Sequence, residues 1–293
     1  MKTGKPRIFR WSQRHNWQLV FLHLLADKIN EAVLAEARRI NPHPLAEDHF
    51  AWLNSVVTTV TKQPSEGIPP LLAQRLSSHY QFIVAFHGTR SNSAADFLEH
   101  GIKLSDTNAI EEQAIQSFGD SKALESAKVE LQSGYGYVER NHGKIHLSLT
   151  KNVFLMGGEC EGYLLDGSEY RAAIANRLRR RELPPKPLIV ECLIPTSMLT
   201  AEFWRERSYA MLEDYFERLL HPSEKRRVKP SYPNITQSIP AGSVLHVHEF
   251  IEVKRRFQGY NPVTCLSEES VETVLRPFKI WPGNAIAQSS TPK

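Results

Sequence analysis

The segment from Gln81 to Arg90, which reads QFIVAFHGTR, constrains the fold more than any other part of the chain. Its apolar centre contains a β-branched pair and predicts a buried strand that ends in His87, Gly88 and Thr89. An imidazole, a backbone without a side chain and a hydroxyl thus meet at one end of a strand. Because glycine lets a ligand approach the main chain closely, this end suits a planar amide and a ribose, which an NAD site must hold.

The residues that follow extend this pattern. Ser91 to Ser93 open an amphipathic helix over residues 94–100, Gly101 ends it, and residues 102–105 resume an extended pattern. In this context the chain resembles the ADP-ribosyltransferase superfamily, especially the branch whose first core strand carries His-Gly-Thr or His-Gly-Ser. Poly-ADP-ribose polymerases and RNA 2′-phosphotransferases belong to that branch.

The resemblance implies that NAD is a substrate and assigns a role to each motif residue. His87 is expected to hold the ribose next to nicotinamide, while the backbone of Gly88 and the hydroxyl of Thr89 hold the nicotinamide itself. Arg90 directly follows and is assigned to the same cofactor site.

A second strand is predicted from Lys144 to Thr150. Because side chains alternate along a strand, His146, Ser148 and Thr150 face away from the leucines and isoleucine between them. RNA phosphotransferases carry a similar His-Leu-Ser, and arginine-directed ADP-ribosyltransferases carry a Ser-x-Ser/Thr strand. The resemblance therefore places His146 and Ser148 beside the NAD, the alternative being an ordinary half-exposed strand with a polar outer side.

Residues 133–137, Ser-Gly-Tyr-Gly-Tyr, predict a flexible loop with aromatic side chains. In ADP-ribosyltransferases a loop near this place covers the dinucleotide, and a tyrosine stacks on nicotinamide. Tyr137, or else Tyr135, is assigned to that role by resemblance. The tyrosine of the family usually follows the second strand, whereas both of these precede it.

The chemistry requires stabilisation of positive charge on the ribose, because the nicotinamide–ribose bond breaks through an oxocarbenium-like state. A carboxylate near the ribose meets this need, as it does in glycosidases. In the family this glutamate lies before an Ile-Pro turn. Here that segment offers Asn234, Thr236 and Gln237 but no acid, so we assign Gln237, with His87 and His146, to the catalytic positions and leave the glutamate unidentified.

Three interpretations of the missing glutamate stay open. The protein is an RNA 2′-phosphotransferase-like enzyme, in which the 2′-phosphate of the RNA attacks the ribose and no general base is needed. The arginines that this enzyme has beside its His-Leu-Ser strand are then replaced by Arg90 and Arg140. Alternatively, Glu191, Glu249 or Glu252 supplies the carboxylate. In the third interpretation the protein is a catalytically silent module that binds a nucleotide or nucleic acid.

Composition describes an ordinary globular chain, with 293 residues, 41% of them hydrophobic and 23% charged. No apolar run is long enough to span a bilayer, and the basic N-terminus has no apolar block after it. We therefore expect a cytoplasmic protein without membrane contact, and delivery as a toxin or effector leaves no mark in composition. Three scattered cysteines predict neither a disulfide framework nor a zinc site.

The net charge of +4 is mild, but basic residues cluster in three places. Such clusters suit RNA or DNA, although charge runs more often form solvated surfaces. They comprise residues 2–14, 177–181 and 225–229. His246 and His248 share one side of a predicted strand, yet without an evident third ligand they predict no metal site.

The order of predicted elements indicates an α+β fold. Helices are expected over Trp17–Arg39, 46–60 and 69–77, strands over 188–194 and 243–253, and a long helix over 201–220. We predict a helical cap at 1–80, an ADP-ribosyltransferase-like domain with a split β-sandwich at 81–280, and a disordered tail at 281–293. The leading hypothesis is an NAD-dependent ADP-ribosyltransferase that modifies a protein or nucleic acid.

Overall fold

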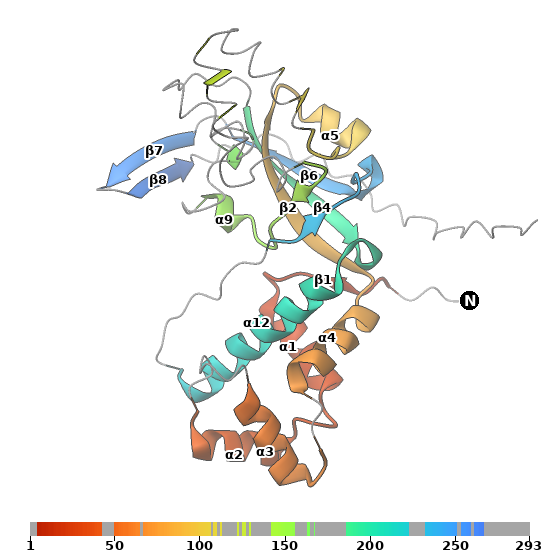
Figure 1. The fold of residues 1–293 in the computed structure, drawn as a ribbon, viewed down its shortest axis with the longest axis vertical. Coiled ribbons are helices and arrows are strands. Elements are labelled where there is room, and N and C mark those ends of the chain that lie inside the picture. The colour runs from red at the N-terminus through yellow and green to blue at the C-terminus, as the bar shows by residue number, and fades with distance from the viewer. Residues whose placement is uncertain are drawn as a thin grey trace, which may run out of the picture.

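The protein has an α+β fold in which helices gather in one half and a mixed sheet forms the other (Figure 1). A computed structural model describes most of the chain, together with scattered positions between 108 and 129. The continuous parts are residues 5–42, 50–64, 67–106, 142–155, 163–164, 167, 186–222, 232–250, 253–258 and 261–266. Tyr137, the predicted tail and two of the three basic clusters lie outside the described residues.

The main sheet has four strands in the order β1-β2-β4-β6. β1 (Ile8–Phe9) runs parallel to β2 (Phe82–Ser91), and β2 pairs antiparallel with β4 (Lys186–Pro195), which in turn pairs antiparallel with β6 (Val244–Glu249). The β2–β4 ladder extends over all ten residues of both strands. It brings the predicted His-Gly-Thr strand and the predicted strand around residue 190 into direct contact.

Two further strand pairs flank this sheet. β3 (Ile145–His146) pairs antiparallel with β5 (Asn234–Ile235), and a bridge between Phe86 and Ser148 attaches this pair to β2. β7 (Val253–Gln258) and β8 (Asn261–Leu266) form a separate antiparallel pair. The strand predicted over residues 144–150 is thus regular for only two residues, which pair with β5, while Ser148 makes a single bridge to β2.

Five helices make up the helical half of the described chain, and short helices accompany the sheet. The former are α1 (Arg14–Leu24), α2 (Glu31–Ile40), α3 (Ala51–Thr61), α4 (Ile68–His79) and α12 (Ala201–Leu220). The latter are α5 (Ala95–His100), α9 (Asn152–Leu155), η1 (Thr196–Met198) and η2 (Ala241–Ser243).

The prediction of one helix over Trp17–Arg39 is wrong, because the structure has α1 and α2 with a turn between them. Asn30 explains the break, since its side chain accepts a hydrogen bond at 3.0 Å from the backbone N–H of Val33 and so caps the start of α2. Leu25 and Ile29 are buried within the turn. Both helices therefore keep the helical spacing of their apolar residues, and the break between them lets the apolar sides of α1 and α2 both face the core.

The helical half is completed by a segment far from the N-terminus. α12 packs closely against α4 and also contacts α1 and α2, while β1, from the predicted cap, belongs to the sheet (Figure 1). One apolar core runs from the helices into the sheet, from Trp17 and Phe21 to Ile83 and Val190. A boundary at residue 80 therefore crosses a continuous core. None of the described helices combines the length and apolarity that are needed to cross a membrane.

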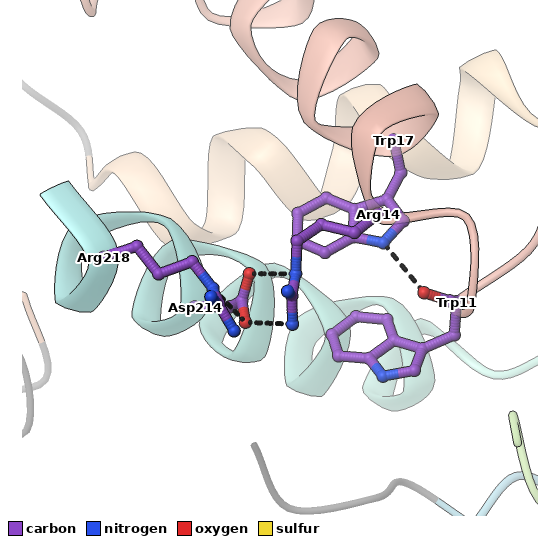
Figure 2. A network of polar contacts seen from close by, with 5 residues as sticks. All are labelled: Trp11, Arg14, Trp17, Asp214 and Arg218. Atoms are coloured by element: carbon purple, nitrogen blue, oxygen red, sulfur yellow. Dashed lines mark hydrogen bonds and ion pairs between the residues drawn. The ribbon is translucent and has the colours of Figure 1, made fainter. Parts of the chain in front are cut away.

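Asp214 of α12 ties the N-terminal segment to this helix (Figure 2). Its carboxylate, 2% exposed, accepts a hydrogen bond at 2.9 Å from Arg14 and lies 3.2 Å from the Nε of Arg218. Nearby, the indole N–H of Trp17 donates to the backbone oxygen of Trp11 at 3.1 Å, and the two indole rings stack. Two charge-assisted contacts thus compensate a buried carboxylate.

Asp214→Ala is expected to destabilise the protein by about 2–3 kcal/mol, because it removes charge-assisted hydrogen bonds at a buried position. Denaturant unfolding monitored by circular dichroism measures this change. Glu36→Ala is the matched control, since it removes an exposed ion pair with Arg39 within α2 and is expected to change stability little. Equal effects of the two substitutions would contradict a special role for Asp214.

Candidate functional site

The β2–β4 register separates the predicted site residues between two faces of the sheet. Residues directly opposite each other share a face, so Gly88 lies with Ile189, and Phe86 lies with Glu191. We call this side the glycine face. His87 lies opposite Val190 on the other side, which packs into the main core and which we call the core face.

His87 makes the contact that joins the two predicted motifs. Its Nδ1 lies 3.0 Å from the backbone oxygen of His146. Because a carbonyl only accepts hydrogen bonds, Nδ1 carries the hydrogen, and Nε2 keeps the lone pair that accepts one. Burial lowers the pKa of His87 to about 4. The imidazole is therefore neutral at pH 7 and has a fixed tautomer.

The backbone of Gly88 points to the edge of β2 from which β3 turns away. Phe86 exchanges backbone hydrogen bonds of 2.7 and 2.8 Å with Ser148 at this edge. Backbone groups alternate between the two edges of a strand, so Gly88 directs its N–H and C=O to the same edge as Phe86. The His146 oxygen opposite accepts from the His87 ring. A planar amide would meet one donor and one acceptor of Gly88 here.

Two aromatic residues lie against Gly88 on the glycine face. A Cβ atom added to Gly88 would lie 2.7 Å from the ring of Phe154 and 3.2 Å from the Cβ of Tyr163. The rings of Phe154 and Tyr163 meet edge to face, and the His146 ring lies 6.2 Å from that of Tyr163. A larger residue at position 88 would therefore force the Phe154 ring to move. The residues that pack against Gly88 are aromatic.

Tyr163 is a candidate site residue that sequence reasoning missed. It is 8% exposed, lies against Gly88 and His146, and follows the second predicted strand in the chain. Its position after that strand was the signal available in the sequence. The assignment of Tyr137 to the same role concerns a residue outside the described part of the chain.

Arg90 and Thr89 occupy the end of β2. The Arg90 guanidinium donates to the backbone oxygen of Leu164 at 2.9 Å, and its Cβ lies close to Gly167. Arg90 therefore holds the segment that carries Tyr163. Thr89 is partly exposed on the core face, opposite Leu188.

Ser148 is placed next to the site but its hydroxyl faces inward. The residue is fully buried, its hydroxyl donates to the Thr150 backbone oxygen at 3.0 Å, and it lies 3.2 Å from the Thr150 N–H. These bonds close a local turn at the end of the bridge with Phe86. In this state the hydroxyl shapes the edge of the site instead of lining its surface.

The segment before the Ile-Pro turn lies beside His146, but Gln237 is not the residue that pairs with it. Asn234 pairs with His146 across β3 and β5, while Gln237 lies in the bend that follows, and both Asn234 and Gln237 are exposed. The structure thus brings His87, Gly88 and His146 together and leaves Gln237 at the surface. Asn234 is the polar residue of this segment that is nearest to His146 in register.

Of the alternative acids, Glu191 lies on the glycine face and is already engaged. Its carboxylate is 3.0 Å from Arg10 and 3.8 Å from the Nε2 of His248. Although burial acts to raise it, the nearby His248 and the hydrogen bond from Arg10 hold the pKa of Glu191 below its ordinary value. Glu249 pairs with Lys186 at 3.1 Å, and Glu252 lies outside the described residues.

The described residues provide no metal centre, and two arginines of the N-terminal basic cluster are already paired. The rings of His246 and His248 are 6.3 Å apart, and no group of three or more His, Cys, Asp and Glu in the described ranges is arranged to hold a metal ion. Arg10 and Arg14 of the N-terminal cluster bind Glu191 and Asp214. These two arginines therefore serve the fold, and their pairing gives no support to RNA or DNA binding by them.

Comparison of the chain with protein-family models, curated proteins and solved structures gave no match.

Gly88→Ala is expected to destabilise the protein by about 1–3 kcal/mol, because the added methyl group overlaps the Phe154 ring in a packed interior. Combining it with Phe154→Leu makes room, so the double variant should lose less stability than the two single variants together. Denaturant unfolding of the four proteins gives the coupling energy. Additive losses would show that the two side chains do not compete for space.

His87 is also expected to make stability depend on pH. Its pKa is about 4 in the folded state and 6.5 as the ordinary value, so the unfolded chain binds the proton more readily between these limits. The stability present above pH 6.5 is therefore lost as pH falls, by about 2.5 kcal/mol at pH 4.5. His87→Gln should remove this part of the loss, measured as the difference in unfolding free energy between pH 7 and pH 4.5.

His100→Gln is the control for that experiment, because the His100 side chain is 64% exposed. It is expected to keep the pH dependence of the original protein. An unchanged pH dependence in His87→Gln would mean that the His87 ring does not titrate as an enclosed, neutral group.

Proposed function

We propose that the protein is an NAD-consuming ADP-ribosyltransferase that modifies a macromolecule. The observation that carries this proposal is the 3.0 Å contact between the His87 ring and the His146 backbone. It joins the His-Gly-Thr motif and the His-Leu-Ser motif, which are far apart in the sequence, at one edge of β2. The β3–β5 pair attached to that edge supports a split β-sandwich.

In this proposal His87 orients the ribose next to nicotinamide. The Nδ1 hydrogen is committed to the His146 oxygen, so Nε2 is an acceptor for a ribose hydroxyl. A neutral imidazole suits this role, because a charged ring would repel the positive charge that develops on the ribose as the bond breaks. The low pKa of His87 keeps the ring in that form.

Nicotinamide binds at Gly88 in this proposal. The carboxamide has one donor and one acceptor, which match the C=O and N–H that Gly88 directs to the edge of β2. Tyr163 and Phe154 provide aromatic surface around the glycine. Since the Phe154 ring packs against Gly88 with the Cβ of Tyr163 beside it, the nicotinamide ring enters by displacing the Phe154 ring and then lies against Tyr163.

An RNA 2′-phosphotransferase-like activity is the second candidate, and the residue opposite His146 favours it. This residue is Asn234, an amide that cannot act as a general base. A reaction in which the phosphate of the substrate attacks the ribose needs no such base. Glu191 lies on the same face as Gly88 but is bound to Arg10. A protein that binds NAD or nucleic acid without catalysis is the third outcome.

Labelled NAD distinguishes these functions. Two preparations are used, one labelled in the nicotinamide ring and one in the adenine. Each is incubated with the protein alone, with cell protein added, with RNA or DNA added, and with 2′-phosphorylated RNA added. Nicotinamide release with adenine label on a macromolecule supports the leading proposal. Release that requires 2′-phosphorylated RNA supports the second candidate. Binding without release supports the third.

His87→Ala is expected to lower nicotinamide release by about a hundredfold or more, because it removes the group that orients the reacting ribose. His100→Ala, which changes an exposed histidine of α5, should leave the rate unchanged. Circular dichroism and the thermal midpoint of both variants show whether they are folded. Full turnover in folded His87→Ala would remove this histidine from the mechanism.

A further inference from the structure

Arg207 of α12 is a buried cation for which the described residues provide no hydrogen-bond acceptor. The residue is 4% exposed, and its Nε and one terminal nitrogen lie below the surface without a partner in the described part of the chain. Two nearby arginines of the helical half, Arg14 and Arg218, both bind Asp214 (Figure 2). Arg207 differs from them in both burial and pairing.

The described carboxylates nearest in sequence do not neutralise Arg207 by direct contact. Glu206 and Glu213 act on it only as charges at a distance. Asp214, two turns further along α12, already has Arg14 and Arg218 as partners. The charge of Arg207 is therefore uncompensated within the described ranges.

Arg207 makes a cation–π contact with Trp11. The guanidinium carbon lies 5.2 Å from the centre of the indole ring. A cation–π contact is a weak substitute for a hydrogen-bonded anion when a charge is withdrawn from water. Burial lowers the pKa of Arg207 to about 10, so the group is still charged at pH 7. The arrangement thus has the donors and the charge of an anion site, and no described carboxylate is bonded to it.

We propose that Arg207 anchors a binding site for an oxyanion, the carboxylate or phosphate group of a small ligand, between α12 and the segment that links β1 to α1. A guanidinium binds both groups with two parallel hydrogen bonds, and aromatic walls strengthen such contacts by excluding water. Trp11 forms one wall and is only partly buried, so the ligand enters beside it. No other role in the proposed reaction uses these residues.

This site is separate from the proposed NAD site. Trp11 packs against Phe9, which pairs with Ile83 at the start of β2. His87 and Gly88 lie further along the same strand, beyond the bridge at Phe86. Loss of oxyanion binding and loss of nicotinamide release can therefore be tested independently.

The test measures the thermal midpoint of the full chain in sodium phosphate and, separately, in sodium acetate, each against chloride at the same ionic strength and pH. Binding to the folded state raises the midpoint, by roughly 2–4 °C at about ten times Kd for a protein of this size. A shift with phosphate alone identifies a phosphate ligand, and a shift with acetate alone identifies a carboxylate. Titration calorimetry with the same anion gives the stoichiometry, which is expected to be one.

Arg207→Met should abolish the shift while leaving the midpoint in chloride unchanged or higher, because it replaces an unpaired buried charge with an apolar side chain. Arg207→Lys keeps the charge but loses the planar fork, and should weaken binding at least tenfold. Arg205→Met is the matched control, since Arg205 lies on the same helix, is exposed and pairs with Glu202. It should retain the full shift.

Two outcomes overturn the proposal. If neither anion shifts the midpoint of the original protein and Arg207→Met lowers it in chloride, Arg207 is a structural cation held by Trp11. If Arg205→Met loses the shift as completely as Arg207→Met, the anions act on surface charge and not at Arg207. Nicotinamide release by Arg207→Met shows separately whether the proposed NAD site is intact.

Discussion

The ten-residue antiparallel ladder between β2 and β4 is the constraint on which the rest of the structure depends. It fixes which residues of the His-Gly-Thr strand share a face with which residues of β4. Gly88 is thereby set against Phe154 and Tyr163, while His87 points into the core face. Slipping this register by one residue would exchange the two faces, with the imidazole facing the aromatic rings and Gly88 facing the core.

The edge of β2 matters as much as its faces. β3 pairs with β5, and Ser148, two residues after β3, bridges to Phe86 of β2, so in the described residues the His146 oxygen bonds to the His87 ring. A regular ladder would have used that oxygen for the backbone of β2. The backbone of Gly88 lies beside this divergence, and it is there that the proposed nicotinamide amide would bind.

Several charged side chains of the helical half have partners of opposite charge. Asp214 has Arg14 and Arg218, Arg75 of α4 pairs with Asp27 in the turn after α1, and Arg39 pairs with Glu36 within α2. Among the described residues Arg207 has no such partner and lies against Trp11. A buried charge without a counter-ion lowers stability, and proteins commonly accept such a cost at sites that bind ligands. The contrast among neighbouring arginines on one core is what singles this residue out.

The sequence by itself determined the local elements. The apolar run before His87, the glycine after the helix that ends at His100, and the amphipathic span of α12 were all predicted correctly, because each depends on neighbours in the chain. The break between α1 and α2 was missed, since an asparagine cap gives a weaker signal than an apolar period. Only the tertiary structure decided that Tyr163 covers Gly88, that Asn234 rather than Gln237 lies opposite His146, and that Arg10 and Arg14 serve the fold. Those contacts join residues tens to hundreds of positions apart, and pairing between strands and packing between helices, which local periodicity does not encode, bring them together.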